Sequence, residues 1–402
     1  MIPFEEARNR ILARVAPLGG ERVPIFAAAG RVLTEEVRAP VDMPPWDNSA
    51  MDGYAVRSAD CARPVALKLT GYLAAGDAAD PKVTPGCAVK IMTGSPIPEG
   101  CDAVVPFEET EESGGFVRIR AGVRPRAHIR FRGEDVKTGD RVIPSGTVLR
   151  PPEISMLASF GKAFVPVYRK ARVALLSTGD ELVELGELLS PGKIINSNTV
   201  SLAAAIEEAG AVPVLLGIAD DDKECLREKV REGLAADALV TSAGVSAGDR
   251  DYVREVLSEL SVEEVFWKVD IKPGRPTAFG MKDGKPVFSL PGNPVSSLVT
   301  FEVFVRPALL KMMGHPEPRK RLVKAVLKEP IRKKAGRTHF FRVRVAVEEG
   351  EYAAWTSGDQ NTGILRTMVL ANGIAVLPAE RTNYEAGEKV DVYLLYQSAT
   401  PK

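Results

Sequence analysis

The chain of 402 residues is poor in histidine and cysteine. Its three histidines, His128, His315 and His339, are too few and too dispersed for a four-ligand zinc site. Its four cysteines have no CxxC spacing; three lie in the N-terminal third, where one disulfide could form, but buried free thiols are the favoured interpretation. Acid–base and metal chemistry would therefore depend on carboxylates.

The sequence also lacks net charge and long apolar runs. Lys plus Arg equals Asp plus Glu at 53 each, so no overall field would attract nucleic acid or an acidic membrane. No stretch approaches the roughly 18 apolar residues of a transmembrane helix, and the N-terminus does not resemble a signal peptide. We expect a cytoplasmic protein that binds neither nucleic acid nor membrane and holds anionic ligands through local groups.

The residues that are present indicate several domains. A short amphipathic helix is predicted over 3–16, and a small β domain over 47–140, where Gly and Pro separate short alternating runs. A helix is predicted over 151–161, opened by proline and closed by glycine. Residues 320–397 again show strands and turns, which predicts a small β-barrel.

Between these regions, apolar strands alternate with amphipathic helices. Strands are predicted at 173–176, 212–216, 238–240 and 265–267, and helices at 199–209, 222–234, 250–259 and 295–313. Asp283-Gly284 separates two further short runs and predicts a hairpin. The alternation predicts a doubly wound α/β domain whose parallel sheet is covered on both faces.

Ligands of such sheets bind at the carboxyl ends of the strands. Here a polar or glycine-rich segment follows each strand in turn, at 177–181, 220–222, 242–248, 272–276 and 290–294. Any one of them could be an ordinary turn. Five on one edge favour a binding site.

The chemistry of these segments suits a phosphate-bearing ligand. Pro291 to Pro294 open a helix whose free amides would bind phosphate. Small residues of 242–248 would let the backbone approach a ligand closely. The predicted binding residues are Gly244, Ser246, Gly248, Lys268, Lys272, Arg275, Pro291, Gly292, Asn293 and Pro294.

Carboxylates at the same edge predict a magnesium site. Glu181, Asp221 and Asp251 are the candidate ligands. Two unpaired carboxylates ~4 Å apart repel by about 4 kcal/mol at an effective dielectric near 20. A magnesium ion bridging them to phosphates would remove that repulsion. For Asp221, a helix N-cap is an equally good interpretation.

Residues 244–248 also fit the GxSxG nucleophile elbow, with Ser246 as nucleophile. The partner histidine would have to be His315 or His339, both at or beyond the end of the α/β domain. A serine hydrolase is therefore the second hypothesis. Neither GxGxxG nor GxxxxGK[ST] occurs, so nicotinamide and P-loop nucleotide sites have no support.

Taken together, the motifs resemble the molybdopterin molybdenumtransferase family, the MoeA type, which includes the E domain of gephyrin. The resemblance covers essentially the whole chain, and DNSAMDGYAV together with PGNPVS is its most specific part. The α/β motifs alone would also fit the smaller adenylyltransferases that make this family's substrate. The matching stretches are 44–57, 91–105, 130–136, 177–182, 242–252, 266–276 and 290–297.

The resemblance implies an elongated homodimer of four-domain subunits. The domains would be an N-terminal domain of 1–46 plus 137–168, an inserted β-rich lid of 47–136, the α/β domain of 169–315 and the barrel of 316–402. The lid of one subunit would overhang the α/β domain of the other. That arrangement would bring Asp52, Thr93 and Asp135 to the cleft as catalytic residues.

The implied reaction takes adenylylated molybdopterin and molybdate, or the near-isosteric tungstate, and releases AMP with Mg²⁺. The resemblance assigns roles in magnesium binding and catalysis to Asp52, Glu181, Asp221 and Asp251. It also makes the adenylyltransferase that supplies the substrate a candidate partner.

A non-catalytic scaffold protein is the third hypothesis. Two departures from the family pattern are an extra acid in 220–222, which leaves the ligating aspartate open, and Arg275 in place of a lysine.

Overall fold

The computed structural model describes residues 1–77, 82–243 and 252–395. The chain forms two compact units. The larger unit comprises Met1–Thr34, Gly146–Arg150 and Phe164–Lys402, and the smaller unit comprises Glu35–Ser145 and Pro151–Ala163.

The larger unit contains a six-stranded sheet in the order β16-β13-β17-β21-β20-β18. Its strands are β13 (Arg172–Thr178), β16 (Val212–Ala219), β17 (Ala238–Ser242), β18 (Glu263–Trp267), β20 (Ala278–Lys282) and β21 (Lys285–Leu290). The first four in spatial order are parallel, as predicted. β20 runs antiparallel to both of its neighbours, β21 and β18. β20 and β21 form the predicted hairpin at Asp283-Gly284, where both residues have positive φ, 52° and 77°.

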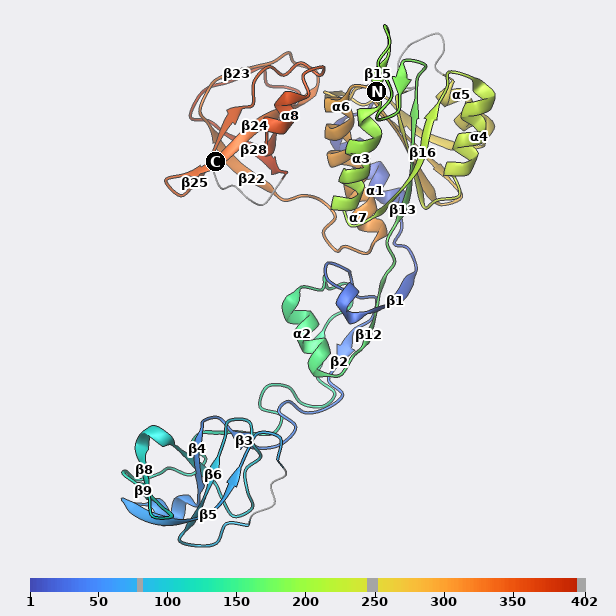
Figure 1. Cartoon of the computed structure of the whole chain (residues 1–402). Helices are drawn as coiled ribbons and strands as arrows, with labels where there is room; N and C mark the ends of the chain where they lie inside the picture. The colour runs from blue at the N-terminus through green and yellow to red at the C-terminus, as the bar shows by residue number, and fades with distance from the viewer. Residues whose placement is uncertain (78–81, 244–251, 396–402) are drawn as a thin grey trace. The chain divides into compact units, whose positions relative to one another are not determined.

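Helices cover both faces of this sheet (Figure 1). α3 (Ser197–Glu208), α6 (Pro294–Thr300) and α7 (Arg306–Met312) lie on one side, and α4 (Lys223–Gly233) and α5 (Val253–Glu259) on the other. Along β13, Val173 and Leu175 belong to one hydrophobic cluster, and Ala174 and Leu176 to the other. Alternate side chains of a buried strand point to opposite faces, so the unbroken apolar run of β13 serves two cores.

The helix predicted over 295–313 is not uniform. A π-helical segment, Phe301–Val305, separates α6 from α7. Pro307 follows directly, and a proline ring has no N–H and collides with the carbonyl four residues earlier. The wider π turn relieves that conflict without ending the helical segment.

The C-terminal barrel closes through pairing of β24 with β26, which confirms the prediction. Its strands are β22 (Leu322–Leu327), β24 (Thr338–Glu348), β25 (Glu351–Thr356), β26 (Gly373–Leu377) and β28 (Lys389–Leu394), and β19 (Ile271–Lys272) adds to β24. The N-terminal helix α1 (Phe4–Arg14) contacts this part of the unit. Phe4 packs against Phe304 and Phe340, and Arg8 donates to the Tyr393 hydroxyl at 2.6 Å.

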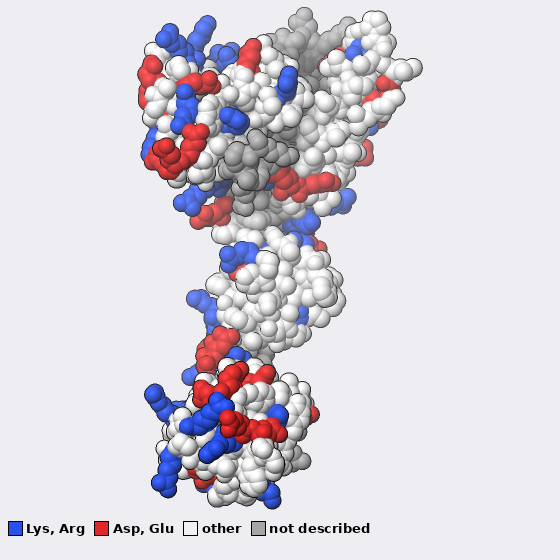
Figure 2. Space-filling model, turned by 60° about the vertical axis from the view of Figure 1, so that its left-hand side comes forward, with Lys and Arg blue, Asp and Glu red and all other residues white. Residues whose placement is uncertain are grey.

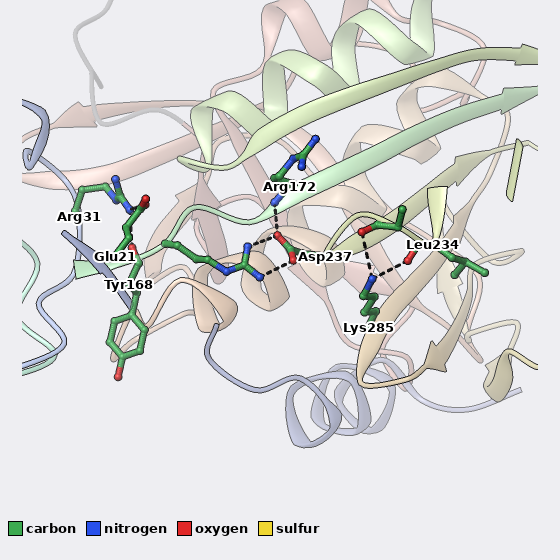
Figure 3. Close-up of polar contacts among 9 residues, drawn as sticks. Glu21, Arg31, Tyr168, Arg172, Leu234, Asp237 and Lys285 are labelled. Carbon is green, nitrogen blue, oxygen red and sulfur yellow. Dashed lines mark hydrogen bonds and ion pairs between the residues drawn. The ribbon is translucent and has the colours of Figure 1, made fainter. Parts of the chain in front are cut away.

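At the amino-terminal ends of the parallel strands, a network of polar contacts fixes where the chain enters the sheet (Figure 3). Both terminal nitrogens of Arg169 donate to the Asp237 carboxylate at 2.6 Å, and the Arg172 amide donates to it at 2.9 Å. Burial alone would raise the pKa of Asp237, but these hydrogen bonds outweigh it and lower the pKa. Nearby, the Lys285 ammonium donates to the carbonyls of Leu234 and Ala235.

The smaller unit holds a six-stranded sheet in the order β7-β4-β6-β5-β9-β8, in agreement with the predicted β domain. Its strands are β4 (Gly53–Val56), β5 (Val65–Leu73), β6 (Cys87–Ile91), β7 (Ala103–Pro106), β8 (Thr110–Ser113) and β9 (Phe116–Ile119), and α2 (Pro151–Ser159) is its helix. Acidic and basic side chains are intermixed on the face of this sheet domain that Figure 2 shows. All four cysteines of the chain are free thiols.

The other elements are short. They are β1 (Gly20–Pro24) with β12 (Phe164–Tyr168), β2 (Val37–Arg38) with β11 (Arg141–Ile143), β3 (Asn48–Ser49) with β10 (Ile129–Arg130), β14 (Leu182–Val183) with β15 (Ile194–Ile195), β23 (Ile331–Arg332) with β27 (Asn383–Tyr384), and α8 (Arg366–Leu370). Among the described helices, none is both long and apolar enough to cross a membrane.

Candidate functional site

A cavity of about 400 Å³ lies where β13, β17 and β21 end, at the edge that the sequence predicted. We call it the strand-end cavity. It is lined by Glu181, Leu182, Ile194, Ile195, Asn196, Ser197, Asn198, Ser242, Ala243, Pro276, Pro291, Gly292, Asn293 and Pro294. Among the described residues, its lining contains no lysine or arginine and one carboxylate, Glu181.

The loop after β21 forms one wall of the cavity. Asn293 is the N-cap of α6 and Pro294 its first residue, the position where a proline costs no hydrogen bond. The Ser297 hydroxyl donates to the Pro291 carbonyl at 2.7 Å and holds the loop in place. A Cβ atom on Gly292 would lie 3.2 Å from the Ala243 Cβ, so the loops after β17 and β21 pack closely only because residue 292 has no side chain.

Two asparagines form the opposite wall. Asn196 caps α3: its Oδ1 accepts from the Thr199 amide at 3.3 Å and from the Ser177 hydroxyl at 3.0 Å. Asn198 donates through Nδ2 to the Ser242 hydroxyl at 2.8 Å and to the Gly292 carbonyl at 2.7 Å. The sequence prediction missed both. An asparagine before a helix is a signal that could have identified Asn196, whereas the partners of Asn198 are distant in sequence.

The predicted carboxylates follow β13 and β16. A Cβ on Gly179 would lie 2.3 Å from a Glu181 carboxylate oxygen, so the Glu181 side chain lies directly over a glycine that leaves room for it. Asp180 accepts from the Asp221 amide at 2.9 Å and links the two loops. The N-cap of α4 is Asp222, which accepts from the Cys225 amide at 2.8 Å. The interpretation of Asp221 as the N-cap is therefore wrong.

The predicted magnesium site lies only in part within the described residues, 1–77, 82–243 and 252–395. They contain no group of three or more His, Cys, Asp or Glu side chains placed to hold a metal ion. The third predicted ligand, Asp251, lies outside the described residues. So do Gly244, Ser246 and Gly248, which include the candidate nucleophile.

A second opening, which we call the cationic cleft, is lined by residues of β19 and of the barrel and measures about 810 Å³. Lys272 enters it from the α/β domain, as predicted for a substrate-binding cation. Lys268 and Arg275 are not among the described residues that line either opening. The polar lining of the cleft consists of Lys272, Arg332, Lys333, Lys334, His339, Arg342, Asp359, Gln360, Asn361 and Thr362.

The positive charge of the cleft affects the pKa of His339. Burial, together with the neighbouring cations Lys333 and Lys272, lowers the pKa of His339 to about 4. The imidazole is therefore neutral near pH 7. Its ring stacks on Phe341, with the two centroids 6.0 Å apart.

Arg342 shapes the wall of this cleft from inside the barrel. Its side chain is fully buried; Nε donates to the Thr367 hydroxyl at 2.9 Å, and Nη2 donates to the carbonyls of Asp359 and Asn361 at 3.0 and 3.2 Å. Burial lowers the pKa of Arg342. The sequence analysis did not single out this residue, because its partners lie 15 or more positions away along the chain.

The segment 272–276 separates the two openings. Lys272 and Pro273 line the cationic cleft, whereas Pro276 lines the strand-end cavity. The side-chain Nδ2 of Asn293 also donates to the Thr362 hydroxyl at 3.3 Å. This hydrogen bond joins a residue that lines the cavity to a residue that lines the cleft.

In the smaller unit, two of the predicted catalytic residues lie together. The amide and the hydroxyl of Thr93 donate to Asp52 Oδ1 at 2.7 and 2.8 Å. These two hydrogen bonds, the amide's first, lower the pKa of Asp52. Asp135 is exposed, and its backbone amide donates to the Met43 carbonyl at 3.0 Å.

Fold and site together define a multidomain α/β enzyme with a MoeA-type architecture. Three family models match it: the MoeA N-terminal region (domain I and II) over residues 2–161, a probable molybdopterin binding domain over 174–311, and the MoeA C-terminal region (domain IV) over 324–395.

Characterised proteins match along the whole chain. The molybdopterin molybdenumtransferase of Haemophilus influenzae is 36% identical over 397 residues, covering 98% of each chain. Molybdopterin molybdenumtransferase 2 of Mycobacterium tuberculosis is 38% identical over 382 residues, covering 92% of this chain and 94% of the relative. The crystal structure of the molybdopterin biosynthesis MoeA protein from Pyrococcus horikosii superposes with a TM-score of 0.85 at 33% identity, covering 98% and 99% of the two chains.

The chain belongs to the molybdopterin molybdenumtransferase family, and it is a transferase. None of the proteins named above is a hydrolase, so the alternative of a serine hydrolase with Ser246 as nucleophile has no support.

Proposed function

We propose that this protein inserts molybdenum into molybdopterin by acting on adenylylated molybdopterin together with molybdate or tungstate, and that it releases AMP. The observation that carries the proposal is the pairing, across residues 272–276, of a cavity whose described lining holds no cation with a cationic cleft. A pterin is a neutral fused ring, whereas the oxyanion and the phosphates are anions. The strand-end cavity would suit the pterin ring, and the cationic cleft would suit the anionic reactant.

The strand-end cavity would hold the pterin. It lies within the region matched by the probable molybdopterin binding domain, and its volume of about 400 Å³ is typical of small-molecule sites. Prolines and short apolar side chains supply flat walls, and the asparagines supply hydrogen-bonding groups.

The cationic cleft would attract the oxyanion. Lys272, Arg332 and Lys333 face one space, and their mutual repulsion is relieved when an anion binds between them. Neutral His339 adds no further positive charge at pH 7. Lys272 is the residue we expect to influence oxyanion affinity most, because it lies at the boundary with the cavity.

Magnesium would be held by Glu181 and Asp221, with Asp251 as the third carboxylate. The donor chemistry fits, because the two described ligands are hard oxygen groups on loops linked by the bond from the Asp221 amide to Asp180. When bound, the ion would neutralise phosphate charge during cleavage of the phosphoanhydride. Glu181 would be positioned by the space over Gly179.

We further propose a homodimer of four-domain subunits in the predicted division, with Asp52, Thr93 and Asp135 completing the partner's site. The adenylyltransferase that makes the substrate would be a transient partner.

The test is AMP release from adenylylated molybdopterin with magnesium and each oxyanion. We expect release by the wild type, none from Asp52→Ala or Glu181→Ala alone, and partial recovery when the two variants are mixed and exchange subunits. Mixed dimers would carry one intact site. Wild-type protein that binds its substrate but releases no AMP would favour the non-catalytic scaffold, and a monomer in light scattering would exclude the shared site.

A further inference from the structure

The two loops that carry the candidate magnesium ligands are joined by hydrogen bonds beyond the ends of their strands. β13 and β16 are paired as far as Thr178 and Ala219. The next amide along the chain, that of Gly179, donates to the Ala219 carbonyl at 3.3 Å. The Asp221 amide donates to Asp180 Oδ1 at 2.9 Å. This second bond is shorter and its acceptor is a carboxylate, so it is the stronger of the two.

The backbone of Asp180 is fixed without help from its side chain. The Lys193 ammonium donates to the Asp180 carbonyl. The Ile194 amide donates to the carbonyl of the next residue, Glu181, at 2.8 Å. On the other side, Gly179 has a φ of 137°, a conformation that L side chains rarely adopt. The turn at 179–181 is therefore a fixed support from which the Asp180 carboxylate can hold the neighbouring loop.

Asp221 is fixed from its other side by the helix that follows it. Asp222 is the N-cap of α4, and its carboxylate accepts from the Cys225 amide at 2.8 Å. The Leu226 amide donates to the Asp222 carbonyl at 3.0 Å, which begins the helical pattern. The carboxylates of Asp180 and Asp222 are thus engaged with backbone amides, and the residue that both of them hold in place is Asp221.

We infer that Asp180 is a positioning residue for the cation site: its carboxylate holds the backbone of Asp221 so that Asp221 and Glu181 bind the same metal ion. This inference rests on the proposed function, which assigns these two residues to magnesium. A loop that is ordered only when the ion binds loses conformational entropy at that moment, and the loss weakens binding. The bond from the Asp221 amide to Asp180 orders the loop before the ion arrives.

Asp180 also carries a negative charge, which would attract a cation even without the hydrogen bond. Asp180→Asn separates the two effects, because the amide oxygen of asparagine can still accept from the Asp221 amide but has no charge. Asp180→Ala removes the charge and the acceptor together. Positioning therefore predicts that asparagine restores most of what alanine loses. Asp180 is exposed and other contacts fix its turn, so we expect both variants to fold.

The experiment is a titration of the full-length protein with Mn²⁺, followed by electron paramagnetic resonance of the free ion, with Mg²⁺ as the competitor. Mn²⁺ is the probe because it prefers the same oxygen ligands as Mg²⁺. Groups that orient metal ligands change metal affinity by roughly 10- to 100-fold when they are removed. Since the bond to Asp180 is exposed, we expect the lower end of that range for Asp180→Ala, a Kd raised roughly tenfold, and Asp180→Asn within roughly threefold of the wild type.

Asp140→Ala is the matched control. Asp140 is likewise exposed and accepts one backbone amide, that of Lys137 at 3.0 Å, but it belongs to the smaller unit. Its Mn²⁺ affinity should equal that of the wild type. AMP release at varied Mg²⁺ gives a second readout. Asp180→Ala should need more Mg²⁺ for half of its maximal rate and should regain a rate close to that of the wild type at saturating Mg²⁺, whereas a general loss of structure would lower the saturated rate.

Equal Mn²⁺ affinity in the wild type and in Asp180→Ala would overturn the inference. So would equal weakening in Asp180→Asn and Asp180→Ala, because the charge would then act directly, and so would a saturated rate that Mg²⁺ does not restore. These results leave the proposed function in place as long as the wild type releases AMP with Mg²⁺. No release by the wild type would reject the function itself, and Mn²⁺ affinity unchanged in Asp221→Ala would reject the assignment of Asp221 and the inference with it.

Discussion

The strand-end cavity and the cationic cleft are built in opposite ways. The cavity is formed by short residues close to the backbone, at the ends of parallel strands. The cleft is formed by long cationic side chains of the barrel together with Lys272. Five residues, 272–276, separate them. Under the proposed function, the chain would recognise a neutral ring by shape and hydrogen bonds, and anions by charge, in two spaces that share one boundary.

The two openings also differ in what holds their walls. The cavity wall is held by bonds between loops of one domain, such as Asn198 to Gly292. The cleft wall depends on a buried arginine that organises the loop 357–363 from within the barrel. A substitution in the barrel should therefore affect the cleft and spare the cavity.

Arg342→Ala should have the largest effect. It removes a buried guanidinium and leaves two loop carbonyls and the Thr367 hydroxyl without their donor. We expect a loss of about 3–5 kcal/mol in the free energy of unfolding, and loss of oxyanion-dependent turnover with pterin binding retained. Urea unfolding measures the first quantity. Arg344→Ala, at an exposed position on the same strand, is the control, and an equal midpoint for the two variants would contradict the role of Arg342.

His339 should make the cleft sensitive to acid. Its pKa is lowered from 6.5 to about 4, so the unfolded chain binds the proton more readily and stability falls as the pH drops from about 6.5 towards 4. The expected loss is up to about 3 kcal/mol. His339→Gln should flatten this part of the stability–pH curve, measured by urea unfolding at each pH. An unchanged slope would show that His339 binds its proton as readily in the folded protein as in the unfolded chain.

Asp237→Asn tests the far end of the same sheet. It should cost about 1–3 kcal/mol, because Arg169 loses its charged partner. The lowered pKa of Asp237 also means that its contribution is present above the ordinary carboxyl range and is lost as the pH falls through the folded-state value. Pterin and oxyanion affinities should stay unchanged. A change in either affinity would show that ligand binding at the carboxyl ends of the strands also depends on contacts at their amino-terminal ends.

Lys272→Ala should have the smallest and most selective effect. We expect the KM for molybdate to rise roughly tenfold, equivalent to about 1.4 kcal/mol, while pterin affinity stays constant. Steady-state AMP release at varied oxyanion concentration measures it. Lys324→Ala, which removes an exposed barrel lysine, is the control. Equal loss of pterin affinity would mean that the segment 272–276 does not separate the two openings.

The sequence by itself determined the elements whose signals are local. The strand at 173–176 in a sheet covered on both faces, the Asp283-Gly284 hairpin and a helix with proline near its start after residue 293 were all predicted. Each depends on periodicity or on backbone preferences of adjacent residues. The resemblance to the MoeA family, carried by contiguous motifs, was likewise confirmed.

Only the tertiary structure decided which side chains share a space. Asn198 meets Gly292, Arg342 meets the loop at Asp359, and the π turn before Pro307 appears only where the helix is packed. Of the three cations that the sequence grouped, Lys272 lines the cationic cleft, and Lys268 and Arg275 are not among the described residues that line either opening. Hydrogen bonds and burial act over a few ångströms between residues that can be distant in sequence, and sequence spacing carries no information about such distances until the chain has folded.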